Sequence, residues 1–305
     1  MNQAVRIEAE TVAQTACNLC RGTGHTFLFR KEGYDLVRCN GCALVFVANP
    51  PGAVEVGELY SADDDYHTQL FDPDGAEFAR MRRVARQHLK VLRKSIPDGS
   101  GLSLLDIGCS SGLFLKEARE AGYAVQGVEL SPNSSRFARE HFGLTVHNGL
   151  LDSAGFAPES FDVITLFDVI EHVPDPLAEL VKIRDLLKPG GLLLQSTPNI
   201  DGLFPRVSYP LAGKLDYWPH PEPPHHLYQF SVETLTAMTA KAGFETGRVD
   251  QTRIDLGYSF GTPEHWKRSK KLVPYALLFA PAAILGPWIG MGDWFYLAAR
   301  KPAQL

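Results

Sequence analysis

The chain has 305 residues, of which 45% are hydrophobic, so it is large enough to bury an α/β core and a smaller appendage. Its formal net charge of -5 argues against a polyanion as the main partner, because affinity for phosphates comes from clustered Lys and Arg. The first residues include acidic side chains and no apolar run of signal-peptide length, so we expect a cytoplasmic protein with reduced thiols.

Four of the five cysteines form two Cys-x2-Cys pairs, Cys17 with Cys20 and Cys39 with Cys42, and 18 residues separate the pairs. This spacing is typical of a zinc ribbon, in which each pair lies on a tight knuckle next to short strands. The alternatives are buried free thiols or a redox pair. Four thiolates leave no open coordination position, so we expect a structural Zn²⁺ within a small N-terminal module, residues 1–50.

Residues 51–100 are expected to form a connector rich in Pro, Gly and Asp, followed by a helix. The helix is predicted between Gly75 and Ile96, where apolar residues recur at helical spacing and Arg and Lys occupy the other face. Its expected core positions are Phe78, Met81, Val84, Ala85, Leu89 and Leu92.

Residues 101–305 are expected to form the main domain, because predicted strands and helices alternate along this part of the chain. Such an order predicts an α/β fold, with a Rossmann-like sheet of seven mostly parallel strands covered by helices on both faces. The expected strands are 102–107, 123–130, 145–148, 161–167, 192–197, 244–254 and 292–301, and the expected helices are 113–121, 131–142, 176–187 and 231–243.

The loop "GCSSG" after the first of these strands is the first candidate site, because ligands of such sheets bind beyond the carboxyl ends of the strands. It lacks the G-x-G-x-x-G pattern of a dinucleotide site, since Ser110 takes the second glycine position between Gly108 and Gly112. Asp106 precedes the loop, and Glu129 ends the second strand, where a carboxylate can accept both hydroxyls of a ribose. A nucleoside with a carboxylate and no phosphates, such as S-adenosylmethionine, satisfies these features.

Residues 101–250 resemble the class I S-adenosylmethionine-dependent methyltransferases in the segments "LLDIGCSSG", "GVELS", "SFDVITLFDVIEHVPDP" and "LLKPGGLLLQSTPN". The segments "EHVPDP" and "PPHHLYQFS" are most similar to the branch with ubiquinone O-methyltransferases and zinc-ribbon methyltransferases of sugars and lipid-linked intermediates. The ribbon and a long apolar insertion at 267–292 depart from the pattern of the quinone enzymes.

The resemblance implies the class I methyltransferase fold and a cofactor site whose residues each contact one part of S-adenosylmethionine. It implies Asp106, Gly108 and Gly112 for the methionine end, Glu129 for the ribose, the backbone of Leu150 and Leu151 for the adenine edge, and Phe167 and Asp168 beside the sulfonium.

The candidate catalytic residues are His172 and His226. Methyl transfer from a sulfonium is an in-line displacement, so alignment of acceptor, methyl and sulfur supplies much of the acceleration. A hydroxyl acceptor would also benefit from a base near its proton, and a histidine can serve as that base. The alternative is that Glu171 and His172 cap the next helix and stabilise the loop.

The apolar insertion contains 21 consecutive uncharged residues after the basic run "KRSKK". That length would span a bilayer, but Pro274, Pro281 and Pro287 interrupt it, and a crossing would separate the seventh strand from its sheet. Two interpretations remain: a helical lid over the site, or a hairpin in the membrane surface with Trp288 and Trp294 near the interface. The second is favoured because three prolines and near-total apolarity exceed what a lid requires.

The favoured hypothesis is therefore a methyltransferase for a small-molecule, sugar or lipid-linked acceptor, with peripheral contact at the inner face of the membrane. The alternatives are an RNA or protein methyltransferase that docks through the ribbon, or a quinone-pathway O-methyltransferase. Nucleic acid is disfavoured, because enzymes that methylate base amino groups carry N/D-P-P-Y/F after the fourth strand, where this chain has "FDVIEHV". The ribbon also carries few basic side chains.

Overall fold

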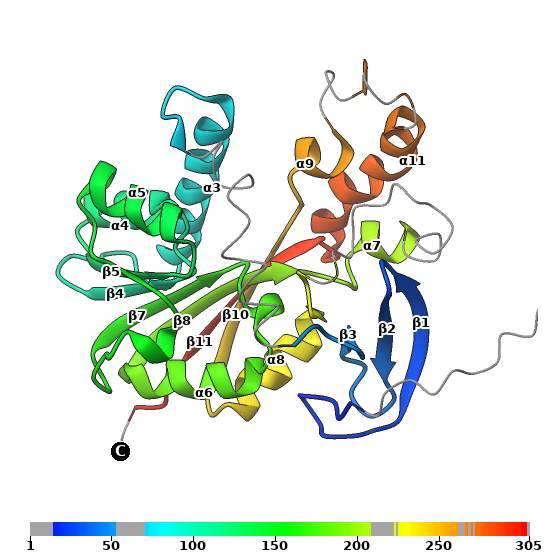
Figure 1. Ribbon diagram of the computed structural model, residues 1–305, viewed down its shortest axis with the longest axis horizontal. Helices are drawn as coiled ribbons and strands as arrows, with labels where there is room; N and C mark the ends of the chain where they lie inside the picture. The colour runs from blue at the N-terminus through cyan, green and yellow to red at the C-terminus, as the bar shows by residue number, and fades with distance from the viewer. Residues whose placement is uncertain are drawn as a thin grey trace, which may run out of the picture.

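The computed structural model describes residues 15–52, 71–208, 223, 225–261, 266–267, 270 and 272–303 (Figure 1). These residues form a seven-stranded sheet and a four-stranded sheet, with helices around the larger one. The helix predicted between Gly75 and Ile96 is confirmed as α3, Ala76–Leu92.

The larger sheet has the strand order β10-β11-β8-β7-β4-β5-β6, and only β11 runs antiparallel to its neighbours. The chain passes from β4 outward to β6 and then returns to β7 on the other side of β4, so the winding reverses between β4 and β7. The seven-stranded, mostly parallel α/β fold is thus confirmed. Its strands are β4 Ser103–Ile107, β5 Ala124–Glu129, β6 Val146–Asn148, β7 Phe161–Phe167, β8 Leu187–Pro198, β10 Glu245–Thr252 and β11 Trp294–Arg300.

Helices cover both faces of this sheet because successive strand residues point to opposite sides. Leu104 belongs to one buried cluster and Leu105 to the other, and Val163 and Ile164 divide in the same way. The first face packs against α3, α4 (Leu113–Glu120) and α5 (Pro132–Phe142), and the second against α6 (Pro176–Leu186) and α8 (Val232–Lys241) (Figure 1).

Local signals set most helix ends. The Ser131 side chain caps α5 by accepting from the Ser134 N–H, and Ser231 and Thr234 form a capping box at α8. The predicted boundary between helix 176–187 and strand 192–197 is wrong, because β8 already begins at Leu187. The segment "KPGG" is accommodated within β8 by a register shift in the pairing with β7. Gly190 in this segment has a φ of +75°.

The smaller sheet contains β1 (His25–Lys31), β2 (Tyr34–Cys39), β3 (Val45–Val47) and β9 (Tyr228–Gln229), in that order. Strand β9 comes from a distant part of the chain, yet Val45 pairs with Gln229 and Phe46 with Tyr228. Leu19 and Phe46 also share a buried cluster with Phe230. The cysteine-rich segment is therefore joined to the larger domain by a strand pairing and a common core.

The apolar insertion forms α11 (Leu272–Leu285) and η5 (Gly286–Ile289), which pack with α7 (Leu203–Ser208) and α9 (Leu256–Phe260). The expectation that Pro281 breaks this segment is wrong, since Pro281 lies inside α11. Phe204 of α7, Phe260 of α9 and Tyr275 of α11 form a separate buried cluster, which holds the helix in place. No helix that the structure describes combines the length and the apolar composition of a bilayer span.

Candidate functional site

The glycine loop joins β4 to α4 in a tightly packed turn. Gly108 and Gly112 have φ values of +73° and +78°, a region that favours glycine. A Cβ at Gly108 would lie 2.5 Å from Val169 Cγ2, and one at Gly112 would lie 2.7 Å from Leu144 Cδ1. The predicted tight turn is confirmed, because neither conformation nor space admits a side chain at these two positions.

Asp106 lies at the base of this loop and is 3% exposed. Thr165, its partner in the β4–β7 register, donates its hydroxyl to Asp106 Oδ1 at 2.6 Å. Burial raises the pKa of the Asp106 carboxyl to about 7, and the nearby charge of Glu129 adds to the effect. The surroundings therefore favour the neutral form of this carboxyl relative to its charged form.

Glu129 ends β5 and is 8% exposed. Its Oε2 accepts from the Ser110 N–H at 2.8 Å, and its Oε1 accepts from the Ser131 N–H at 2.7 Å. These bonds fix the carboxylate between the glycine loop and the start of α5. Each oxygen retains a second acceptor position, so the group can still receive hydroxyls of a ligand.

The segment that contains Leu150 and Leu151 follows β6 and lies beside Glu129. The Gly149 N–H donates to the Glu129 carbonyl at 3.0 Å, and Leu151 begins the short helix η2, Leu151–Ser153. Leu150 is exposed, whereas Leu151 is buried. The structure thus brings the residues predicted for the methionine, ribose and adenine parts together at the carboxyl ends of β4, β5 and β6.

Phe167 ends β7 in a stack with a histidine that the sequence analysis did not identify. The centroids of the Phe167 and His88 rings are 3.9 Å apart, and the interplanar angle is 2°. His88 Nδ1 lies 2.9 Å from the Tyr296 hydroxyl oxygen. Burial lowers the pKa of His88 to about 3, so the ring is neutral. The helical period contained the signal, because His88 falls on the same face as Ala85 and Leu92.

Asp168 follows Phe167 in a left-handed conformation, with φ +58°. Its Oδ1 accepts from the Ser196 hydroxyl and from Trp294 Nε1, both at 2.7 Å. Burial raises the pKa of the Asp168 carboxyl to about 6, although these bonds oppose the shift. Trp294 was expected at a membrane interface; that expectation is wrong, because its indole reaches the tip of β7.

His172 and His226 lie together, with ring centroids 4.7 Å apart. His172 Nδ1 lies 2.8 Å from the His225 carbonyl, so Nδ1 donates and Nε2 carries the lone pair. Burial lowers the pKa of His172 to about 4, which keeps the ring neutral at pH 7. The helix-capping part of the alternative is wrong, since the side chain that caps α6 is that of Asp175. Its loop-stabilising part agrees with the bond from His172 to the His225 carbonyl.

Glu171 lies beside this histidine pair and is buried. One potential ligand atom from each of Glu171, His172 and His226 falls within 4.8 Å of the others. Imidazole and carboxylate groups are ligands that several divalent metals accept. These three residues are therefore a second group, besides the cysteines, that could hold a metal ion.

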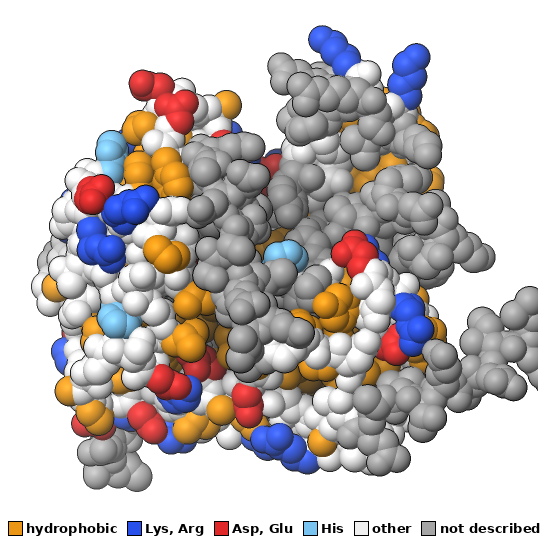
Figure 2. Space-filling view, viewed as in Figure 1, with side chains coloured by type: hydrophobic (Ala, Val, Ile, Leu, Met, Phe, Trp, Pro, Cys, Tyr) orange, Lys and Arg blue, Asp and Glu red, His pale blue; other side chains and the backbone are white. Residues whose placement is uncertain are grey.

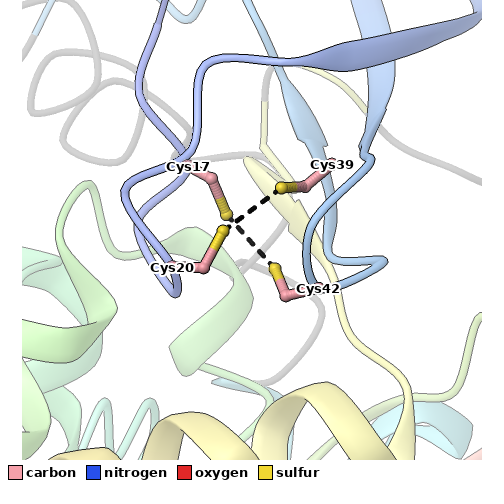
Figure 3. A group of neighbouring side chains, drawn as sticks. All are labelled: Cys17, Cys20, Cys39 and Cys42. Carbon is pink, nitrogen blue, oxygen red and sulfur yellow. Dashed lines mark hydrogen bonds between the residues drawn. The ribbon is translucent and has the colours of Figure 1, made fainter.

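The four cysteines of the ribbon converge on one point (Figure 3). The sulfurs of Cys17 and Cys42 are 3.5 Å apart, and those of Cys20 and Cys39 are 3.4 Å apart. Zinc–sulfur bonds of about 2.3 Å would place tetrahedral ligands about 3.8 Å from one another, close to these separations. The Gly22 N–H also donates to Cys20 Sγ at 3.4 Å, as is usual around metal-bound thiolates.

Comparison with known proteins places this geometry in a family. The profile of a methyltransferase domain matches residues 76–248, more than half of the chain. The ubiquinone biosynthesis O-methyltransferase of Cereibacter sphaeroides is 43% identical over 123 residues, which are 39% of this chain and 49% of the relative. The chain thus spans about half the length of the curated relatives that it matches first.

Solved structures agree on the fold. The phosphoethanolamine N-methyltransferase 2 of Haemonchus contortus, in complex with S-adenosyl-L-methionine, is 22% identical, with a TM-score of 0.50 over 82% of this chain and 56% of its own. The [4+2]-cyclase SpnF is 18% identical, with a TM-score of 0.54 over 84% of this chain and 99% of its own. The chain therefore belongs to the methyltransferase domain family and has the class I fold.

Proposed function

We propose that the chain transfers a methyl group from S-adenosylmethionine to a small-molecule, sugar or lipid-linked acceptor. The observation that carries the proposal is the position of Glu129, whose carboxylate is fixed beside the glycine loop by the N–H groups of Ser110 and Ser131. The fold alone is insufficient, because a protein described as a [4+2]-cyclase shares it.

Each proposed cofactor contact has a chemical reason. Asp106 would hold the ammonium group of the cofactor and Glu129 the ribose hydroxyls, while the amides at the start of α4 would receive its carboxylate. Leu150 and Leu151 would border the adenine, and Phe167 and Asp168 the sulfonium. The cofactor supplies a methyl group on a positively charged sulfur; the chain supplies orientation and exclusion of water.

His172 and His226 are the proposed catalytic residues for an acceptor that must lose a proton. His172 is neutral at pH 7, and its tautomer leaves Nε2 as the basic nitrogen. Nε2 would take the proton of the acceptor as the new bond to carbon forms. His226 packs edge-on against this ring and would orient it or relay the proton.

We also propose that Cys17, Cys20, Cys39 and Cys42 bind a structural Zn²⁺ in a module of residues 1–50, followed by a connector at 51–100 and the methyltransferase domain at 101–305. The four sulfurs lie within 4.8 Å of one another, which supports this assignment. With all four positions taken by thiolates, the ion would have no catalytic role. It would fix β3 and, through the β3–β9 pairing, the wall of the site that contains His226.

The exposed face of α11 and η5 supports contact with an anionic membrane surface. Leu277 is 75% exposed and Trp288 is 86% exposed, and Lys267 and Lys270 precede the helix in the chain. Figure 2 shows basic side chains that project from this end of the molecule, above hydrophobic ones. Apolar insertion combined with basic residues is the usual mode of peripheral binding to anionic lipid.

Vesicle sedimentation tests the membrane contact. The chain should sediment with vesicles that contain phosphatidylglycerol and remain in solution with pure phosphatidylcholine. Trp288→Ser should reduce vesicle binding. Phe27→Ser changes an exposed aromatic residue of β1, outside α11 and η5, and should not reduce it. Equal sedimentation of the two variants would remove α11 and η5 as the contact surface.

Labelled S-adenosylmethionine tests the activity. The chain is incubated with the labelled cofactor and with lipid and soluble cell extracts, and mass spectrometry identifies products that gain a methyl group. Ubiquinone-pathway phenols belong among the acceptors tried, because the relatives are named for that pathway. Calorimetry that shows tight binding of a nicotinamide dinucleotide and none of S-adenosylmethionine would contradict the proposal.

A further inference from the structure

A small cavity lies beyond the carboxyl end of β8, beside His226. Its volume is about 30 Å³, which is enough for a water-sized polar group. Four segments that are distant in sequence form its walls. The lining residues are Pro198, Asn199, Ile200, Phe204, Pro205, His226, Gln229, Ile254 and Asp293.

Asp293 contributes an unpaired carboxylate oxygen to this cavity. The residue is 1% exposed, and its Oδ1 accepts from the Phe204 N–H at 3.1 Å. Its Oδ2 is buried and has no hydrogen-bond partner among the described residues. Such an oxygen is costly to bury, so it indicates a missing donor.

Gln229 contributes an unpaired donor to the same cavity. The side chain is 7% exposed, and Nε2 is buried without a partner among the residues that the structure describes. Its backbone is fixed by the antiparallel pairing of β9 with Val45 of β3. The residues that line the cavity therefore include one vacant acceptor and one vacant donor.

A hydroxyl group matches both vacancies. It donates one hydrogen, which a carboxylate oxygen can accept, and its oxygen accepts from an amide N–H. An ammonium group would satisfy Asp293 alone, and an ether or carbonyl oxygen would satisfy Gln229 alone. The remaining walls, including Ile200, Phe204 and Ile254, are apolar and suit the carbon atoms next to the hydroxyl.

We propose that Asp293 and Gln229 form the specificity site for the acceptor, and that they hold a hydroxyl group at the end of an apolar portion of that molecule. This inference rests on the proposed methyl transfer. It adds Asp293, which lies outside the sequence motifs, and gives a role to Gln229, which lies within "PPHHLYQFS". The site adjoins the cofactor residues, because Asp293 precedes Trp294, whose indole donates to Asp168. Burial raises the pKa of the Asp293 carboxyl to about 7, which agrees with an oxygen that lacks its partner.

Binding of small alcohols tests this site without turnover. The full chain is saturated with S-adenosylhomocysteine, and ligand-observed NMR gives dissociation constants for 1-hexanol, 1-fluorohexane and hexylammonium. We expect 1-hexanol to bind about tenfold more tightly than 1-fluorohexane, which matches its shape but cannot donate. Asp293→Asn and Gln229→Leu should each reduce this preference to about threefold or less. The matched control Asp201→Asn, on a carboxylate outside the cavity, should retain it.

Several outcomes overturn the proposal. Equal affinity of 1-hexanol and 1-fluorohexane, or a preference that survives both variants, would mean that the cavity holds only water. Tighter binding of hexylammonium would assign an amine in place of the hydroxyl. Failure of S-adenosylhomocysteine to bind would instead contradict the proposed function, and the alcohols would then be measured with the chain alone. If Asp293→Asn does not fold, Gln229→Leu and the wild-type ligand series still decide the matter.

Discussion

Two parts of the site are built from contacts of very different range. On the cofactor side, at the ends of β4 to β6, Glu129 is bound by Ser110 and Ser131, which are 19 and 2 residues away. On the acceptor side, around β9, α7 and the start of β11, the Phe204 N–H donates to Asp293, which is 89 residues away. A short motif can therefore specify the first side, whereas the second exists only after distant segments have packed together.

The largest expected effect is on the cofactor side. Glu129→Gln removes the charge that two backbone N–H groups and the ribose hydroxyls share, so affinity for S-adenosylhomocysteine should fall by at least about 30-fold. Calorimetry measures the change. Glu120→Gln, on an exposed carboxylate of α4, is the matched control and should leave affinity unchanged. A change of less than about twofold for Glu129→Gln would show that the cofactor side is assigned to the wrong residues.

Loss of the ribbon should damage the acceptor side selectively. Cys39→Ser should lower the bound zinc and loosen the β3–β9 pairing that fixes Gln229, so turnover should fall by about tenfold. Affinity for S-adenosylhomocysteine should change by less than about threefold, because no cofactor residue lies on the ribbon. Zinc analysis, calorimetry and product assays separate the two effects.

The control for this variant is Cys109→Ala, which removes the buried thiol of the glycine loop. It should leave the zinc content unchanged. If Cys39→Ser weakened the cofactor and the acceptor equally, the ribbon would support the whole domain and not one side of the site.

Protonation of Asp106, on the cofactor side, should make the affinity for the cofactor depend on pH. Its folded pKa, about 7, exceeds the ordinary 3.8, so its contribution to folding is complete below about pH 4 and is lost as pH rises through about 7. Binding of a ligand ammonium needs the charged form, so affinity for S-adenosylhomocysteine should rise by about fivefold between pH 6 and pH 7. Asp106→Asn should abolish this dependence in calorimetry, whereas Asp201→Asn should preserve it.

The range of contacts also explains which features the sequence could predict. All seven strands of the larger sheet were predicted, since each has its own apolar pattern, and Ser131 marked the start of α5. The helices α7 and α9 were missed, because they are short and depend on packing against α11. The pairing of β9 with β3 and the place of Trp294 had no local signal at all. The cavity residue Asp293 was missed for the same reason.

Trp294 offers the finest test, because it joins the two sides. Trp294→Phe keeps an aromatic ring but removes the N–H that Asp168 accepts, so the Asp168 carboxyl retains the hydrogen bond from the Ser196 hydroxyl. Loss of one such bond should lower turnover by about threefold without changing the fold. Trp288→Phe makes the same chemical change on an exposed residue and should leave turnover unchanged.

Substitutions at the two tryptophans should therefore have opposite effects: those at Trp288 should affect vesicle binding, and Trp294→Phe should affect turnover. Trp288→Ser should weaken vesicle binding, whereas Trp294→Phe should not, because its indole faces Asp168 and not the surface of α11. Turnover and sedimentation measured on the same preparations make the comparison direct. If Trp294→Phe lost vesicle binding and kept full turnover, the Trp294 indole would belong to the membrane-binding surface. The position of Asp168 would then depend on its bond with Ser196 and not on Trp294.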